Sequence, residues 1–209
     1  GLLRSNEAWC CLNAPAFVFR PSHADMMHLD LWVYGENLLR DAGSFSYNAE
    51  DKWLDYFPAV KAHNTVEFDH REPMPKLSRF LYANWPQYER LIAEKDKMAL
   101  EAGYSTYFGA RHARRVEIKN KQIVITDTLN GVKQSAKLRW RLADLGWQID
   151  GQSISSSAFH IALTCDKSLS GFQLAEGFES RYYGKKATIP VLEAEVIEDA
   201  EIITTINWQ

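Results

Sequence analysis

The chain has 209 residues, 46% of them hydrophobic and 24% charged, which is typical of a globular protein with one large core. Its formal net charge of −3 gives no basic excess that would hold nucleic acid, so no nucleic-acid partner is expected. No apolar run approaches the roughly 20 residues that span a bilayer, and the three cysteines form no CxxC pair, so neither a membrane span nor a zinc ribbon is expected.

Alternation of apolar and polar residues is the dominant pattern in the first third of the chain. A first strand is expected over residues 12–19. In the stretch 27–34 the aliphatic residues Leu29, Leu31 and Val33 alternate with polar and aromatic ones, which predicts a strand with those three side chains in a core. The remaining residues of that strand, His28, Asp30 and Trp32, are expected on its opposite face.

A hairpin should follow this strand. Residues 35–37, Gly-Glu-Asn, are expected to turn the chain into a second strand over 38–41. Further strands are expected over 63–69, 78–83, 98–108, 111–119, 122–127, 135–142, 146–149, 153–164, 185–195 and 201–206. Only residues 88–102, rich in Glu, Lys, Leu and Ala, favour a helix. The count predicts an all-β fold, a large antiparallel β-sandwich over residues 1–209.

Two histidines and an aspartate stand in polar contexts near this hairpin. His23 precedes the first strong strand, Asp41 closes the hairpin, and His63 begins a later strand. Imidazole and carboxylate are natural zinc ligands, and three of them leave a coordination position open. Alternatively, each histidine caps or hydrogen-bonds a loop. His28 and Asp30 share a strand face and could also join a site, but an exposed polar face is the simpler explanation for them.

Three ordered blocks resemble the heparinase II/III-like family of polysaccharide lyases. They are HADMMHLDLW at residues 23–32, GENLLRDAGSFSYN at 35–48 and AHNTV at 62–66. The resemblance implies a carboxy-terminal β-sandwich that follows an amino-terminal α/α toroid in this family. The toroid is expected to be absent from this chain, and the chain alone is therefore expected to be inactive as a lyase.

The resemblance also implies a divalent metal, zinc in characterised relatives, bound by His23, Asp41 and His63, with Asp25 supporting the site. Some members place a catalytic histidine two residues before the metal-binding one, where this chain has Pro21. Either His23 takes the catalytic role here or catalysis depends on residues of the toroid.

The reaction that the resemblance implies is β-elimination at a uronic acid of heparin, heparan sulfate or a related acidic polysaccharide. Asn64, Tyr47 and Arg20 are expected to contact this substrate, Tyr47 as a wall of the cleft rather than as the base. The partners are then the acidic polysaccharide and the toroid domain, and the location is periplasmic or secreted in a bacterium.

Two other functions stay open at this point. The same fold can serve as a non-catalytic carbohydrate-binding or capsule and exopolysaccharide-assembly module, whose aromatic residues Trp32, Tyr34, Trp53 and Tyr56 stack on sugars. The histidines can also be incidental to a plain β-sandwich. The sequence that precedes Gly1 would separate these functions, because a lyase of this family needs the toroid.

Overall fold

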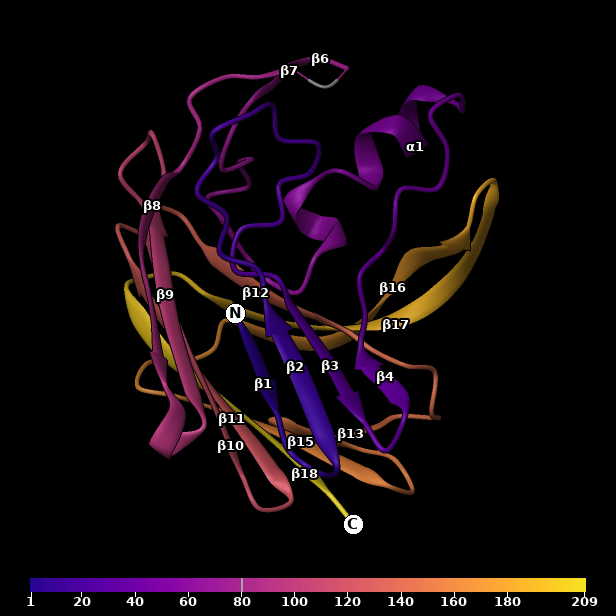
Figure 1. Cartoon of the computed structure of the whole chain (residues 1–209), viewed down its shortest axis with the longest axis vertical. Helices are drawn as coiled ribbons and strands as arrows, with labels where there is room; N and C mark the ends of the chain where they lie inside the picture. Colours follow the sequence, from indigo (N-terminus) through magenta and orange to yellow (C-terminus); the bar gives the residue numbers. More distant parts are fainter. Residues whose placement is uncertain (80) are drawn as a thin grey trace.

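The computed structural model describes residues 1–79 and 81–209, and most of the chain lies in antiparallel strands (Figure 1). The all-β fold and the β-sandwich are thereby confirmed. No helix among the described residues has the length and apolar character needed to cross a membrane.

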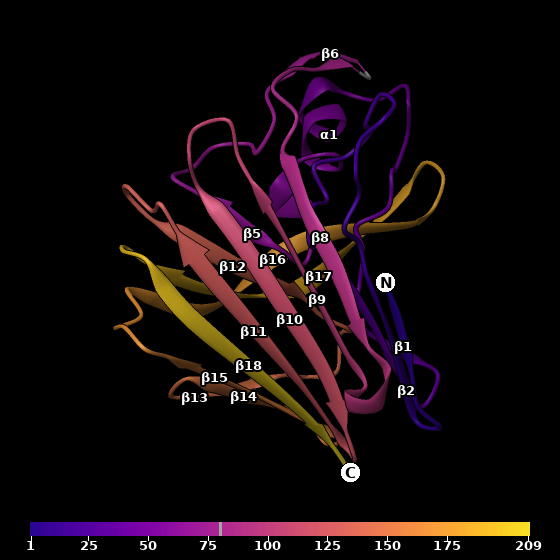
Figure 2. The same cartoon turned by 60° about the vertical axis from the view of Figure 1, so that its left-hand side comes forward.

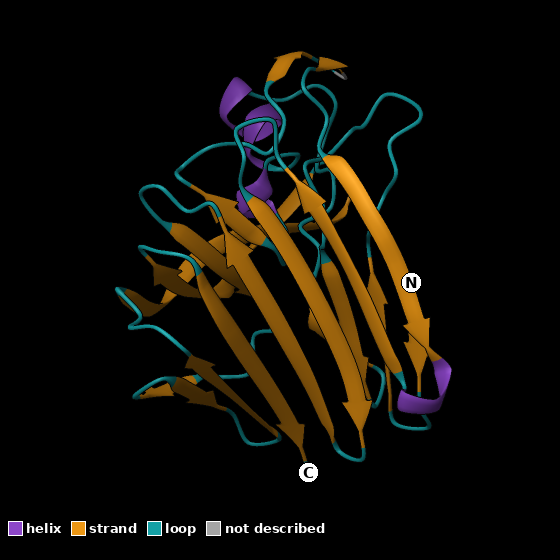
Figure 3. Ribbon diagram, turned by 90° about the vertical axis from the view of Figure 1, so that its left-hand side faces the viewer, coloured by secondary structure: helices purple, strands orange, loops and turns teal. Residues whose placement is uncertain are grey.

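The largest layer of the sandwich is an eight-stranded sheet, which faces the viewer in Figure 3. Its order is β13-β14-β15-β18-β11-β10-β9-β8. The strands are β8 Gln87–Glu94, β9 Ala99–Ser105, β10 Arg111–Lys119, β11 Gln122–Asn130, β13 Gln148–Asp150, β14 Ser153–Ser155, β15 Phe159–Cys165 and β18 Ala200–Trp208.

Two four-stranded sheets form the second layer, which lies behind the large sheet in Figure 2. One has the order β1-β2-β3-β4, with β1 Leu2–Arg4, β2 Ala8–Leu12, β3 Leu29–Val33 and β4 Glu36–Leu39. The other has the order β16-β17-β12-β5, with β5 Val66–Phe68, β12 Ala136–Arg141, β16 Gly171–Tyr182 and β17 Lys185–Val196. The bridge between Leu39 and Leu142 joins the two edge to edge, and apolar residues of all three sheets form one core.

Short elements gather over one end of the sandwich, at the top of Figure 1. They are α1 Asp51–Tyr56, the 3₁₀ turn η1 Val60–Ala62, and the two-stranded sheet of β6 Lys76–Ser78 and β7 Leu81–Tyr82. A second 3₁₀ turn, η2 Lys95–Lys97, connects β8 to β9 at the edge of the large sheet.

Residues 27–34 form the strand that their alternation predicts, except that His28 lies elsewhere than expected. Leu29, Leu31 and Val33 are fully buried in β3, while Asp30 and Trp32 are half-buried on its other face. His28 does not share that outer face. It precedes the strand and is buried, because Met27 turns the chain with a φ of +59°.

The predicted hairpin forms between β3 and β4, although its turn lies earlier than expected. Tyr34 and Gly35 occupy the turn with φ of +48° and +83°, so that β4 begins at Glu36. Two residues with positive φ match the twist that antiparallel strands require in a two-residue loop. Asp41 consequently lies two residues beyond the end of β4.

The predicted helix at 88–102 was wrong. The segment forms β8, η2 and β9, and its charged residues make cross-strand ion pairs instead of pairs along a helix: Arg115 of β10 binds Glu94 and Glu101 at 2.7 and 3.4 Å. Helix propensity is a weak preference that such tertiary pairing overrides.

Other strand bounds also differ from the prediction. The strand expected at 12–19 was wrong, because β2 ends at Leu12 and the loop that follows contains Pro15, which lacks the N–H for a ladder. The strand at 78–83 contains Phe80, which lies outside the described residues, and β16 was not predicted. All but two of the twelve β16 positions are exposed or half-buried, which obscures the alternation.

Candidate functional site

Three chain segments that follow or precede strands of the second layer meet below the short elements. They carry His28 before β3, Asp41 after β4 and His63 before β5. The Nδ1 atom of His63 lies 2.8 Å from Oδ2 of Asp41, and Nε2 of His28 lies 3.7 Å from the same oxygen. One ligand atom from each of these three residues lies within 4.8 Å of the other two, which is a spacing that suits a metal ion.

The hydrogen bonds of His63 leave one of its nitrogens unused. Because the Asp41 carboxylate accepts, Nδ1 of His63 carries the proton and donates it, which leaves the lone pair on Nε2. This Nε2 is buried and has no hydrogen-bond partner within residues 1–79 and 81–209. A buried, unpaired imidazole nitrogen beside a carboxylate fits a zinc-type ligand set.

His28 is held by a backbone donor. The N–H of Asn64 donates to Nδ1 of His28 at 3.0 Å, so the proton of the neutral ring resides on Nε2, toward Asp41. In this tautomer His28 has no free lone pair for a metal. Its Nε2 lies 3.7 Å from Asp41 and makes no hydrogen bond with the described residues.

His23 lies on the open side of this group. Its ring centroid is 5.3 Å from that of His63, and its Nε2 is 3.4 Å from the Ser44 hydroxyl. The structure therefore brings His23, Asp41 and His63 into one neighbourhood, with His28 added to them. Sequence reasoning allowed His28 to join a site but favoured an exposed position for it, and the buried turn at Met27 explains the difference.

The environment keeps His23 and His28 neutral. Burial lowers the pKa of His23 to about 4, with a further contribution from His63. Burial lowers the pKa of His28 to about 3 against the opposing effect of Asp41. Burial alone would raise the pKa of Asp41, but the hydrogen bond and charge of His63 outweigh it and hold that pKa below its ordinary value. Neutral imidazoles and an ionised carboxylate are the forms that bind metal.

The shift at His28 predicts an acid-sensitive fold. Because the folded-state pKa of about 3 lies below the unfolded value of about 6.5, the unfolded chain binds a proton that the folded chain does not. This contribution to stability is complete at high pH and falls as the pH drops below about 6.5. In the presence of chelator, the free energy of unfolding should fall by about 2 kcal/mol from this residue between pH 7 and 5.

Denaturant unfolding at a series of pH values checks this expectation. The variant His28→Gln should have a lower stability at pH 7 and a flatter pH dependence. A variant whose pH dependence equals that of the original chain would contradict the assignment.

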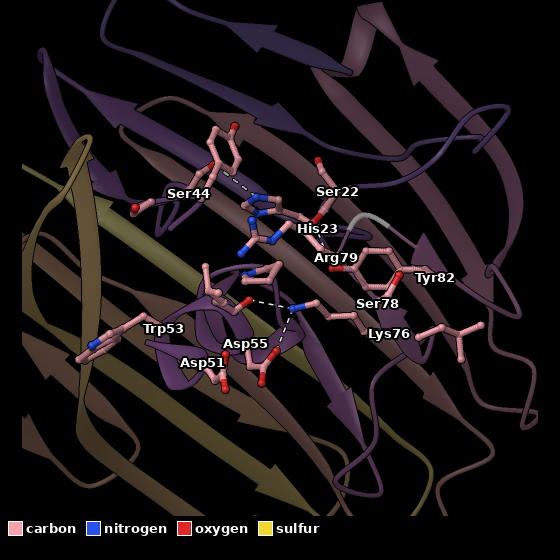
Figure 4. A pocket seen from close by; sticks show the side chains of 15 residues that line it. Ser22, His23, Ser44, Asp51, Trp53, Asp55, Lys76, Ser78, Arg79 and Tyr82 are labelled. Atoms are coloured by element: carbon pink, nitrogen blue, oxygen red, sulfur yellow. Dashed lines mark hydrogen bonds and ion pairs between the residues drawn. The ribbon is translucent and has the colours of Figure 1, made fainter. Parts of the chain in front are cut away.

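A cleft of about 360 Å³ opens beside this group, on the His23 side (Figure 4). Its lining residues come from the loops before β3 and after β4, from α1 and from β6 and β7: Ser22, His23, Ser44, Ser46, Tyr47, Asp51, Trp53, Leu54, Asp55, Pro58, Lys76, Leu77, Ser78, Arg79 and Tyr82. Lys76 is committed to Asp55 and to the carbonyl of Leu54, both at 2.8 Å. Figure 4 shows the side chains of Arg79 and His23 reaching into the same part of the cleft.

The three residues predicted to contact substrate lie in different surroundings. Tyr47 lines the cleft and its ring is 56% exposed. Arg20 is exposed on the preceding loop and is not among the lining residues. Asn64 is fully buried: its amide donates to the carbonyls of Leu29 and Arg40, and its oxygen accepts the N–H of Arg141. Substrate contact by Asn64 stays a prediction, whereas the structure gives it a role in joining β3, β4 and β12.

Two residues at or beside the cleft were not proposed as functional by sequence reasoning. Arg79 is an exposed cation that lines the cleft, in the turn between β6 and β7. Tyr183, at the tip of the β16–β17 hairpin, accepts hydrogen bonds from the Ser46 hydroxyl at 3.2 Å and the Tyr47 N–H at 3.3 Å, two residues that line the cleft. The bond from Ser46, that from Tyr47 and the nearby Arg79 lower the pKa of Tyr183. Tyr183 meets these residues only in the folded chain, because they are more than 130 residues away in sequence.

The sequence matches a family model described as "Heparinase II/III-like, C-terminal" over residues 10–193. A search of curated proteins gave no match. Among solved structures, heparinase III (the BT4657 gene product) is similar with a TM-score of 0.80 and 18% identity, over 96% of this chain and 32% of that chain. The heparan sulfate lyase HepC from Pedobacter heparinus is similar with a TM-score of 0.73 and 18% identity, over 96% of this chain and 33% of that chain.

A structure described as heparinase III is also similar, with a TM-score of 0.71 and 15% identity, over 89% of this chain and 30% of that chain. At identities this low the likeness shows a shared fold. The chain spans about a third of the length of the solved structures that it matches.

Proposed function

The chain belongs to the heparinase II/III-like family, whose carboxy-terminal domain it represents, and we propose that it forms one wall of the active site of a lyase that cleaves uronate-containing polysaccharides by β-elimination. The observation that carries this proposal is the cleft at residues 22–82, where the neutral imidazole of His23 and the cation of Arg79 face the same space.

The chemistry of β-elimination requires both kinds of group. The C5 proton of a uronate is too weakly acidic for a side chain to remove unless the adjacent carboxylate is neutralised and the enolate-like charge is stabilised. In our proposal the Arg79 guanidinium pairs with the substrate carboxylate. Neutral His23 then donates a hydrogen bond to that carboxylate or accepts the C5 proton, and Tyr47 forms the wall against which the sugar lies.

We also propose that His23, Asp41 and His63 would bind a divalent metal, and that this metal is zinc. Imidazole and carboxylate are donor types that zinc binds, and the lone pair on Nε2 of His63 has no hydrogen-bond partner among the described residues. A bound metal would tie the segments at 23, 41 and 63 together and so fix the cleft wall. In our proposal Asp25 supports the first of these segments, and in the structure it accepts a hydrogen bond from Asn13 at 2.7 Å.

The two roles of His23 exclude each other within one catalytic state. If the metal takes the lone pair of His23, the remaining catalytic groups must come from the part of the protein outside this chain. If His23 instead contacts substrate, only Asp41 and His63 remain as ligands, and the metal would bind more weakly. The structure favours neither by distance, because His23 lies near His63 and also lines the cleft.

The test is an activity assay on a protein that carries this domain at the full length of the matched lyases. Heparan sulfate, heparin and other uronate polymers are incubated with it, and unsaturated product is followed by ultraviolet absorbance. We expect activity that His23→Ala lowers by about 10²–10⁴-fold, the usual contribution of a proton-transfer group. His160→Ala, at an exposed position on β15, is the matched control and should retain activity.

The chain of 209 residues assayed alone should form no unsaturated product. Turnover by this chain would contradict the division of the catalytic groups. Binding of acidic polysaccharide by the longer protein, without turnover on any uronate polymer, would instead support the carbohydrate-binding function.

A further inference from the structure

A buried arginine lies directly beneath the His/Asp/His group. Arg114, at the centre of β10, is fully buried between the two layers of the sandwich. Its Nη1 donates to the carbonyl of Met27 at 2.5 Å and to the carbonyl of Asn64 at 2.7 Å. A single side-chain nitrogen of the large sheet, Nη1 of Arg114, therefore binds two segments of the opposite layer.

These two carbonyls belong to the residues next to the buried histidines. Met27 immediately precedes His28, and its positive φ turns the chain there. Asn64 immediately follows His63, and its own N–H donates to His28. Moving Arg114 would therefore alter both the spacing of the two segments and the hydrogen bond that sets the tautomer of His28.

The guanidinium is itself fixed on its other side. Asp127 of β11 accepts from Nε of Arg114 at 2.6 Å and from Nη2 at 3.2 Å, and His112 lies 2.7 Å from the same carboxylate. The ring of Trp140 covers the guanidinium at 4.6 Å. The planar fork of an arginine can meet a carboxylate and two carbonyls at once, which the single ammonium of a lysine cannot.

We propose that Arg114 is a positioning residue that holds the segments of His28 and His63 at the spacing required for the metal site. Through it, the ion pair in the core of the sandwich determines the geometry of the cleft wall. An effect of replacing Arg114 on metal affinity is expected only if the proposed function is correct. An effect on the spacing of the two segments is expected whether or not the site binds a metal.

The test compares Arg114→Lys with Val116→Ala in the chain of 209 residues. Val116 is a fully buried residue two positions further along the same face of β10, so its truncation lowers stability at a similar depth. Amide hydrogen exchange is measured at Asn64, whose N–H donates to His28, and at Leu29, whose N–H donates to the carbonyl of Asn64 at 3.3 Å. Exchange at these two amides should be at least about tenfold faster in Arg114→Lys than in Val116→Ala at equal global stability, because local opening is then easier.

Zinc affinity provides the second measurement. We expect Arg114→Lys to weaken zinc binding by about 10–100-fold, as is usual for residues that orient metal ligands, and Val116→Ala to leave it unchanged. If Arg114→Lys does not fold, Asp127→Asn keeps Arg114 in place but loosens it, and the same two measurements apply.

Each outcome has a distinct meaning. Equal exchange at Asn64 and Leu29 in Arg114→Lys and Val116→Ala would overturn the positioning role of Arg114. Faster exchange at these amides, in a chain that binds no zinc even without substitution, would support the positioning role and contradict the metal part of the proposed function.

Discussion

Replacing His63 by alanine is expected to remove specific zinc binding and to lower the melting temperature of the zinc-loaded chain. His63 is fully buried, its Nδ1 binds Asp41 and its Nε2 has no other partner in the described residues, so the substitution removes one of the three proposed ligands. A metal that binds only the folded form at 100 times its Kd stabilises it by about 2.7 kcal/mol, and losing this should lower Tm by about 5–10 °C in a chain of this size.

The measurement separates the metal from the cavity that the substitution leaves. Metal content and melting curves are recorded for the original chain and for His63→Ala, each with and without chelator. We expect chelator to lower the Tm of the original chain but not that of the variant. Any remaining difference between the two chelated proteins reports the lost side chain. His160→Ala is the control and should bind zinc like the original chain.

Binding should also weaken as the pH falls toward the lowered pKa of His23, about 4, because protonated imidazole has no lone pair for a metal. An original chain that contains no metal and melts identically with and without chelator would contradict the metal site. His23, Asp41 and His63 would then form a hydrogen-bond network, and His23 would be the better candidate for a catalytic residue in the cleft.

Replacing Gly43 by alanine is expected to destabilise the fold by about 3 kcal/mol, the sum of a strained backbone and a steric clash. Gly43 has a φ of +74°, and a Cβ there would lie 2.3 Å from the carbonyl oxygen of Ser180 in β16. Its N–H donates to Oδ1 of Asp41 at 2.6 Å, so the displacement would reach the carboxylate of the site.

Gly35→Ala is the matched control for this substitution. Gly35 has a φ of +83°, but a Cβ there would meet nothing within 4 Å. It should cost only the backbone strain, about 1 kcal/mol. Denaturant unfolding of both variants gives the difference, which measures how firmly the β16–β17 hairpin packs against the segment of Asp41. Equal losses would mean that this hairpin gives way freely and does not position Asp41.

The β-sandwich and the types of residue in the candidate site could be predicted from the sequence. The alternation of Leu29, Leu31 and Val33 predicts a strand with one buried face because the period of two is a local property of the backbone. The order of the three sequence blocks identified His23, Asp41 and His63 as a group before their distances were known. The strand and the fold were confirmed because they depend on short stretches of chain or on a family pattern, whereas the roles of the three site residues stay a prediction.

Which further side chains lie beside His23, Asp41 and His63, and which contacts fix their positions, could be seen only in the tertiary structure. Glu94 has the local pattern of a helical residue, but in the folded chain Arg115 of β10 is its cross-strand partner. Arg114 is 87 residues from Met27 in sequence, yet it binds the carbonyl that precedes His28. Local propensities differ by less than 1 kcal/mol per residue for most residue types, whereas burial and charge-assisted hydrogen bonds contribute more than that and join distant segments. The distant contacts therefore determine the site, and no short stretch of the sequence contains them.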